Sequence, residues 1–164
     1  MRAPLALASG ALLVTGSLLT PAAAAPEAPA LSGTAVKFLK IVCPADGSWD
    51  SVNHNWHRAY GRAKRVDDGT RVPTYLRRSY RSAAAKHRNA AAKLDAGVWP
   101  ATVEANLPKV VSYYATAGNW LASRDTAVVG PQWLPWSSVT DDDGAWDRIL
   151  RALHVRAKDC RAYD

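Results

Sequence analysis

Residues 73–97 read PTYLRRSYRSAAAKHRNAAAKLDAG, and the fold class that we predict rests first on this stretch. Its apolar positions recur every three or four residues, the spacing that places side chains on one face of an α-helix. These positions are Leu76, Tyr80, Ala83, His87, Ala90 and Leu94. Pro73 suits the first turn of a helix, and Gly97 suits its end. We therefore predict an amphipathic helix over this stretch.

The same helical spacing continues on both sides. Residues 34–63 predict a first helix, which Pro44 kinks or splits because proline cannot donate a backbone hydrogen bond. Residues 99–121 predict a third helix with a kink at Pro108, and a last helix extends from residue 146 to about residue 160. We expect a turn at 67–69 and a long loop over 124–140.

No segment shows the alternation of a β-strand, so the expected fold is all-α. Four helices with short early connections predict an up-down-up-down four-helix bundle. The chain has 164 residues, of which 48% are hydrophobic and 21% charged, a composition that is typical of a globular domain. We expect residues 31–164 to form this single domain.

Residues 1–30 have the pattern of a secretory signal peptide and its processing region. Arg2 precedes an apolar stretch over 5–19, and small residues follow, so that cleavage after Ala24 and cleavage after Ala30 both fit. An uncleaved membrane anchor is less well supported, because the apolar stretch is short, and no later stretch is long enough to span a membrane. The sequence thus predicts a secreted protein, with association with the cell wall as a further option.

The chain has two cysteines, Cys43 and Cys160. An even number of cysteines in an exported chain favours a disulfide bond, and two cysteines allow only one pairing. In an up-down bundle the first helix starts at the end where the fourth helix finishes, so this pairing also fits the topology. A pair of buried free thiols is the alternative.

Three short motifs support a resemblance to a known group of proteins. They are AVKFLKIVCPAD at 35–46, VWPATV at 98–103 and ILRALHV at 149–155. The chain resembles small exported four-helix proteins of actinobacteria over most of residues 34–155. This resemblance implies the fold and no activity, cofactor or catalytic residue. The loop at 124–140 departs from the simple pattern of that group.

Positive charge gathers in one part of the chain. The net charge is +7, yet residues 58–93 hold eleven Lys and Arg against only Asp67 and Asp68. Arg77, Arg81 and Arg88 share one flank of the predicted second helix. Such a field attracts anionic cell-envelope polymers or lipid headgroups. Aromatic residues for base stacking are scarce on this flank, which disfavours nucleic acid. Polyanion binding through these arginines is one hypothesis, and an ordinary solvated arginine face is the interpretation that the sequence favours.

Asp50, His54 and His57 fall on one side of the predicted first helix. Imidazole and carboxylate groups suit Zn or Cu, so a weak metal site is one hypothesis. These residues lie away from the apolar stripe of that helix, and no fourth ligand is evident. We therefore expect solvated surface histidines and no cofactor.

His87 lies on the apolar face of the second helix, and His154 lies beside the apolar face of the last one. A histidine in such a position is usually hydrogen-bonded in or at the edge of the core. The alternatives for His87 are a pocket histidine, a haem ligand or a general base, which needs a carboxylate to orient it. Glu104, in the third helix, lies off its apolar face. No catalytic motif is present, so an enzyme is not expected.

Trp133 and Trp136 lie close together in the loop over 124–140. Loops of this length inside a domain are usually functional or disordered, and two tryptophans disfavour disorder. We expect both rings to form a lid over the end of the bundle, and a recognition surface is the alternative.

These features together predict a secreted helical-bundle protein that acts as a non-enzymatic binding or envelope-associated module. Two other classes remain open: a carrier of a small apolar ligand or haem in the bundle core, and a small secreted enzyme.

Overall fold

The computed structural model describes residues 31–61, 66–130 and 143–163. These parts are helical, and they contain no β-strand beyond an isolated bridge between Arg71 and Val128. The elements in chain order are α1 (Gly33–Tyr60), α2 (Thr74–Asp95), α3 (Ala101–Glu104), α4 (Leu107–Ser123), α5 (Ala145–Ala152) and the 3-10 helix η2 (Ala157–Ala162). The predicted all-α fold is confirmed over the described residues.

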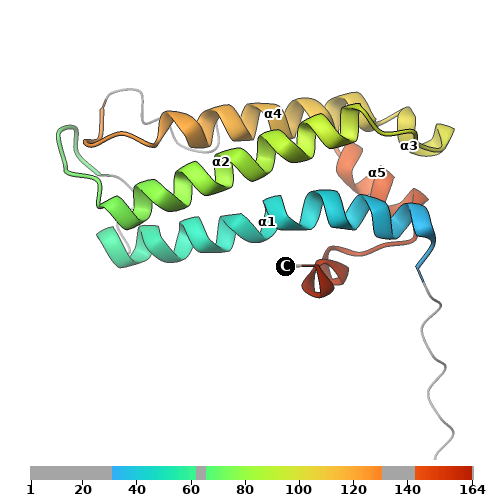
Figure 1. The fold of residues 1–164 in the computed structure, drawn as a ribbon, viewed down its shortest axis with the longest axis horizontal. Helices are drawn as coiled ribbons and strands as arrows, with labels where there is room; N and C mark the ends of the chain where they lie inside the picture. The colour runs from blue at the N-terminus through green and yellow to red at the C-terminus, as the bar shows by residue number, and fades with distance from the viewer. Residues whose placement is uncertain (1–30, 62–65, 131–142, 164) are drawn as a thin grey trace, which may run out of the picture.

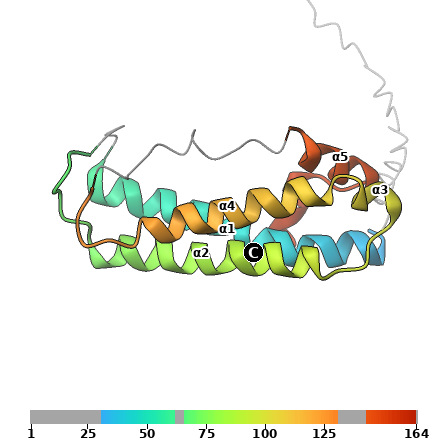
Figure 2. The ribbon, with the colours of Figure 1, turned by 90° about the horizontal axis from the view of Figure 1, so that it is seen from above.

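Three long helices lie side by side along the long axis of the molecule (Figures 1 and 2). Successive long helices run in opposite directions, with α2 packed against both α1 and α4. The short α5 lies at the end of the molecule where α1 begins, and it contacts α3 and α4. The predicted four-helix arrangement is not confirmed, because the described residues contain no fourth long helix.

Helix α1 is continuous over 28 residues, so Pro44 does not split it. Ser32 caps its start, because the Ser32 hydroxyl accepts a hydrogen bond from the amide of Ala35. Gly61 caps its end with φ of 62°, a conformation that suits glycine. Helix α2 begins and ends within two residues of the predicted positions.

The predicted third helix is wrong in one respect, because α3 and α4 are separate helices and not one kinked helix. Proline lacks an amide hydrogen, so Pro108 cannot bond to the carbonyl of Glu104 and the ladder between the two helices is broken. Pro108 instead lies in the first turn of α4, where an amide is not needed.

The predicted last helix is also wrong, because α5 ends at Ala152 and the chain becomes helical again only in η2. His154 separates the two pieces with φ of 54°, a left-handed conformation that interrupts a right-handed helix. Its side chain is exposed and does not belong to the core.

The buried apolar side chains form two clusters along the three long helices. The first cluster contains Phe38, Leu94 and Tyr114, and it combines the start of α1 and α4 with the end of α2 and with α5. The second cluster contains Leu76 and Leu121, and it combines the end of α1 and α4 with the start of α2. No described helix is both long and apolar enough to cross a membrane.

The predicted disulfide bond between Cys43 and Cys160 is confirmed, with 5.1 Å between the two Cα atoms. It joins η2 to the buried side of α1, because Cys43 is fully buried and Cys160 packs against the first cluster. The bond links residues 117 positions apart, so it removes much conformational freedom from the unfolded chain.

The double variant Cys43→Ala/Cys160→Ala should unfold with a free energy lower than that of the parent by about 3–5 kcal/mol, because the unfolded chain gains entropy. Urea denaturation of the oxidised parent and of the variant measures this difference. Equal unfolding free energies would show that the bond does not stabilise the fold.

A second prediction concerns the close approach of α2 and α4 at Gly118. A Cβ atom there would lie 3.1 Å from the backbone nitrogen of Arg88 and 3.2 Å from the carbonyl oxygen of Ala84. Overpacking by Gly118→Ala should cost about 1–3 kcal/mol and the better helix propensity should return about 1 kcal/mol, so the free energy of unfolding should fall by up to about 2 kcal/mol. Ser112→Ala, on the exposed side of α4, is the matched control. A more stable Gly118→Ala variant would contradict this contact.

Candidate functional site

Helix α2 carries a concentration of positive charge. Its basic residues are Arg77, Arg78, Arg81, Lys86, Arg88 and Lys93, and its one acidic residue is Asp95. All of the basic side chains are exposed except that of Arg77, which is half-buried. The apolar face of α2 packs against α1 and α4, so the polar face must point to solvent. We define the basic face as these six basic residues.

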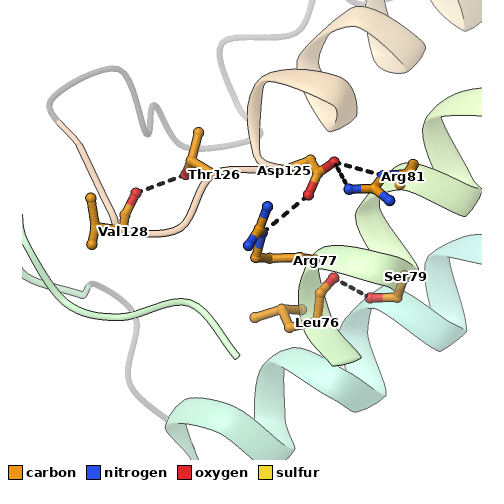
Figure 3. A network of polar contacts seen from close by, with 7 residues as sticks. All are labelled: Leu76, Arg77, Ser79, Arg81, Asp125, Thr126 and Val128. Carbon is orange, nitrogen blue, oxygen red and sulfur yellow. Dashed lines mark hydrogen bonds and ion pairs between the residues drawn. The ribbon is translucent and has the colours of Figure 1, made fainter. Parts of the chain in front are cut away.

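Two arginines of the basic face hold one carboxylate (Figure 3). Arg77 Nε lies 3.2 Å from Asp125 Oδ1, and Arg81 lies 2.8 Å from Asp125 Oδ2 through Nε and 2.7 Å through Nη2. The Asp125 side chain is 18% exposed, whereas the side chains of Arg77 and Arg81 are 32% and 68% exposed. Asp125 therefore neutralises part of the basic face from its buried side.

The segment that carries Asp125 is held in place by backbone hydrogen bonds. It follows the end of α4, and its next residues pair with the chain just before α2. The amide of Val129 donates to the carbonyl of Thr70, and the amide of Val72 donates to the carbonyl of Ala127. The Thr126 hydroxyl donates to the carbonyl of Val128 at 2.7 Å (Figure 3). Asp125 is thus positioned next to the first turns of α2.

Arg88, the third predicted anion-binding residue, also faces α4. Its Nε donates to the side-chain oxygen of Asn119 at 3.2 Å. The structure therefore places all three predicted arginines along the border between α2 and α4, and brings two of them together on Asp125. Sequence reasoning missed Asp125 and Asn119, because each lies 31 or more residues from its arginine partner and no local pattern links them.

The other basic residues of α2 are more open. Arg78, Lys86 and Lys93 are exposed, and the described residues offer them no hydrogen-bond or ion-pair partner. These three side chains were not part of the predicted arginine row. They extend the basic face around the solvent side of the helix and remain available to an external anion.

The residues of the hypothetical metal site do not form one. Asp50, His54 and His57 are exposed on α1, and the Nδ1 of His57 lies 2.8 Å from the carbonyl oxygen of Gly61, to which it donates. Within residues 31–61, 66–130 and 143–163, no group of three His, Cys, Asp or Glu side chains could hold a metal ion. His57 instead helps to close the end of α1.

His87 is fully buried where the two apolar clusters meet. Its Nδ1 donates to the carbonyl of Ala83 at 2.9 Å, so in the neutral ring Nε2 carries a lone pair, and this buried atom has no hydrogen-bond partner among the described residues. The rings of Trp49 and Tyr114 lie 5.5 and 5.6 Å from the His87 ring, centroid to centroid. Burial lowers the pKa of His87, although the bond to Ala83 acts in the opposite direction.

The expected surroundings of a catalytic histidine are only partly present. Asp46 of α1 accepts a hydrogen bond of 2.7 Å from the Tyr114 hydroxyl, and the Tyr114 ring packs on His87. The Asp46 carboxylate therefore holds the tyrosine hydroxyl. Glu104 lies elsewhere, at an open surface depression near α3 that Asp95, Trp99 and Leu107 also line.

Trp133 and Trp136, the predicted lid or recognition residues, lie outside the described residues. The loop that contains them is described only as far as Gly130, where it leaves the segment paired with residues 69–72.

His87 should make the fold sensitive to acid. The ordinary pKa of a histidine side chain is about 6.5, and burial lowers the pKa of His87 in the folded protein. Below about pH 6.5 the unfolded chain therefore binds a proton at His87 more readily than the folded protein does. The free energy of unfolding should be unaffected by His87 above pH 6.5 and should fall below it, by up to about 1.4 kcal/mol per pH unit. Urea denaturation between pH 7.5 and 5 measures this slope.

The variant His87→Leu should lose most of this slope, because the buried titrating group is gone. His54→Gln, which replaces an exposed histidine, should retain it. An unchanged slope in His87→Leu would assign the acid sensitivity to other groups.

Comparisons of the chain with protein-family models, with curated proteins and with solved structures found no match. The case for a function therefore depends on the chain's own residues. Among these, the basic face of α2 is the feature with the clearest chemistry.

Proposed function

We propose that the protein is a secreted, non-enzymatic module that binds an anionic polymer of the cell envelope through the basic face of α2. The observation that carries this proposal is the ratio of six basic side chains, five of them exposed, to one acidic side chain along the single helix α2. A helix of 22 residues is about 33 Å long. Such a rod of positive charge can contact several phosphates of a linear polymer at once.

The character of the neighbouring side chains favours a polymer over a lipid surface. Proteins that insert into a membrane interface need exposed apolar or aromatic side chains beside their basic residues. In the described part of the chain, the large hydrophobic side chains that are exposed are Val98 and Val128, and neither belongs to α2. The solvent side of α2 carries small residues instead, among them Ser82, Ala85 and Asn89. Nucleic acid is disfavoured because aromatic residues for base stacking are scarce along α2, where Tyr75 is half-buried.

Two other features support a location outside the cytoplasm. A disulfide bond persists in oxidising compartments, and Cys43 and Cys160 form one. The pattern of residues 1–30 is typical of a signal peptide. The resemblance to small exported four-helix proteins of actinobacteria agrees with this location.

The test uses a variant that removes charge without removing a hydrogen bond seen between the described residues. Arg78→Gln/Lys86→Gln/Lys93→Gln should bind immobilised poly(glycerol phosphate) about tenfold more weakly at low salt than the parent. Binding of the parent should fall steeply between about 50 and 200 mM salt, because polymer counterions are released on binding. Binding isotherms at several salt concentrations measure both effects.

The matched control is Lys40→Gln/Lys158→Gln/Arg161→Gln, which removes the same charge from exposed positions outside α2. The proposal predicts that this control binds nearly as well as the parent. Equal weakening by both variants would indicate a general charge effect and would contradict a site on α2. Stronger binding of the parent to phosphatidylglycerol vesicles than to the polymer would reassign the basic face to a membrane surface.

A further inference from the structure

Arg77, Arg81 and Asp125 have the geometry of an occupied anion site. Arg77 approaches one oxygen of the carboxylate and Arg81 approaches the other, over distances of 2.7–3.2 Å (Figure 3). Two guanidinium groups that converge on one small anion are a common means of binding phosphate or carboxylate. Here the anion is supplied by the chain itself, from the segment just after α4.

We propose that the Asp125 carboxylate is an internal competitor that occupies a phosphate seat between Arg77 and Arg81 and so weakens polymer binding to α2. This inference rests on the proposed function, since it regulates the same basic face. The competing group is one phosphodiester of the polymer, which carries a single negative charge like the carboxylate. An exchange of one for the other therefore leaves the charge balance between the two arginines unchanged.

The exposures of the three side chains define how a phosphate would enter. Arg81 is 68% exposed and forms the open side, whereas Asp125 is 18% exposed and forms the closed side. The Arg77 side chain has an intermediate exposure of 32%. A phosphate can therefore meet Arg81 first and reach Arg77 only when the carboxylate withdraws. Arg78, one position from Arg77 on the solvent side, can hold the next phosphate of the same polymer.

The backbone around Asp125 provides a reason why the carboxylate is a competitor rather than a required brace. Hydrogen bonds between backbone groups of residues 69–72 and 127–129 already join this segment to the start of α2. The segment is therefore held without the carboxylate. Withdrawal of the Asp125 side chain breaks its contacts with the two arginines and leaves those backbone bonds in place.

The variant Asp125→Asn tests the inference, because it keeps the shape of the side chain and removes its charge. Its affinity for poly(glycerol phosphate) at low salt should rise about three- to tenfold over the parent, since the two arginines gain an uncompensated charge. Asp147→Asn makes the same change in net charge at an exposed position of α5 and is the matched control. Equal affinities of the parent and Asp125→Asn would overturn the proposal.

A second measurement examines the seat without any polymer. Inorganic phosphate, titrated at constant ionic strength, should raise the melting temperature of Asp125→Asn by several degrees more than that of the parent or of Asp147→Asn. Arg77→Gln/Asp125→Asn should lose this response, because one side of the seat is gone. The absence of any difference between Asp125→Asn and the parent would identify Asp125 as a structural brace alone.

The two proposals can fail separately. If phosphate stabilises Asp125→Asn selectively but no variant binds the polymer, the seat is present and the proposed function is wrong. If the parent binds the polymer through α2 but Asp125→Asn binds no better, the proposed function holds and the competitor is wrong.

Discussion

The structure depends on the close contact between α2 and α4 at Gly118. The absence of a side chain there lets the α4 backbone approach Ala84 and Arg88 of α2, where even one carbon atom would be crowded. This approach fixes the relative position of the two helices over their full length. It brings Arg88 to Asn119 and allows Asp125 to reach the first turns of α2. The polar border that we assign to anion binding is therefore a consequence of a packing contact, since interiors tolerate almost no unfilled or overfilled space.

The same contact explains why a histidine is tolerated in the core. His87 lies on α2 between the two apolar clusters, and the approach of α4 places the Tyr114 ring against it. The bond from Nδ1 to Ala83 satisfies one ring nitrogen, whereas Nε2 lies among aromatic rings and has no partner in the part of the chain that the structure describes. A buried acceptor without a partner lowers stability. The neutral imidazole is the less costly form there, because a charged ring would lose far more solvation, in agreement with the lowered pKa of His87.

Sequence patterns predicted the features that depend on neighbouring residues. The helical class, the bounds of α2 and the single cysteine pair follow from periodicity, from Pro73 and Gly97, and from the cysteine count. The two prolines show where such patterns stop being informative. Pro44 and Pro108 each remove the hydrogen bond to the carbonyl four residues earlier. Helix α1 nevertheless continues through Pro44, whereas a new helix, α4, starts next to Pro108. The difference depends on tertiary packing, because α3 turns to meet α5. The ion pairs of Asp125 span 44 and 48 residues and leave no local signal.

Charge counted from sequence also differs from charge that is available to a ligand. Residues of α2 sum to a strongly positive helix, but Arg77 and Arg81 share an internal carboxylate and Arg88 is hydrogen-bonded to α4. Half of the basic face is thus engaged within the fold, and Arg78, Lys86 and Lys93 form the open half. Exposed ion pairs contribute little to stability, so the half-buried contacts of Asp125 matter more to the fold than the exposed basic side chains do. The basic residues of α2 therefore divide into two rows. Arg77, Arg81 and Arg88 contact α4 and the segment that follows it, whereas the other three face solvent. Withdrawal of the Asp125 carboxylate would let Arg77 and Arg81 bind an external anion together with the solvent-facing row.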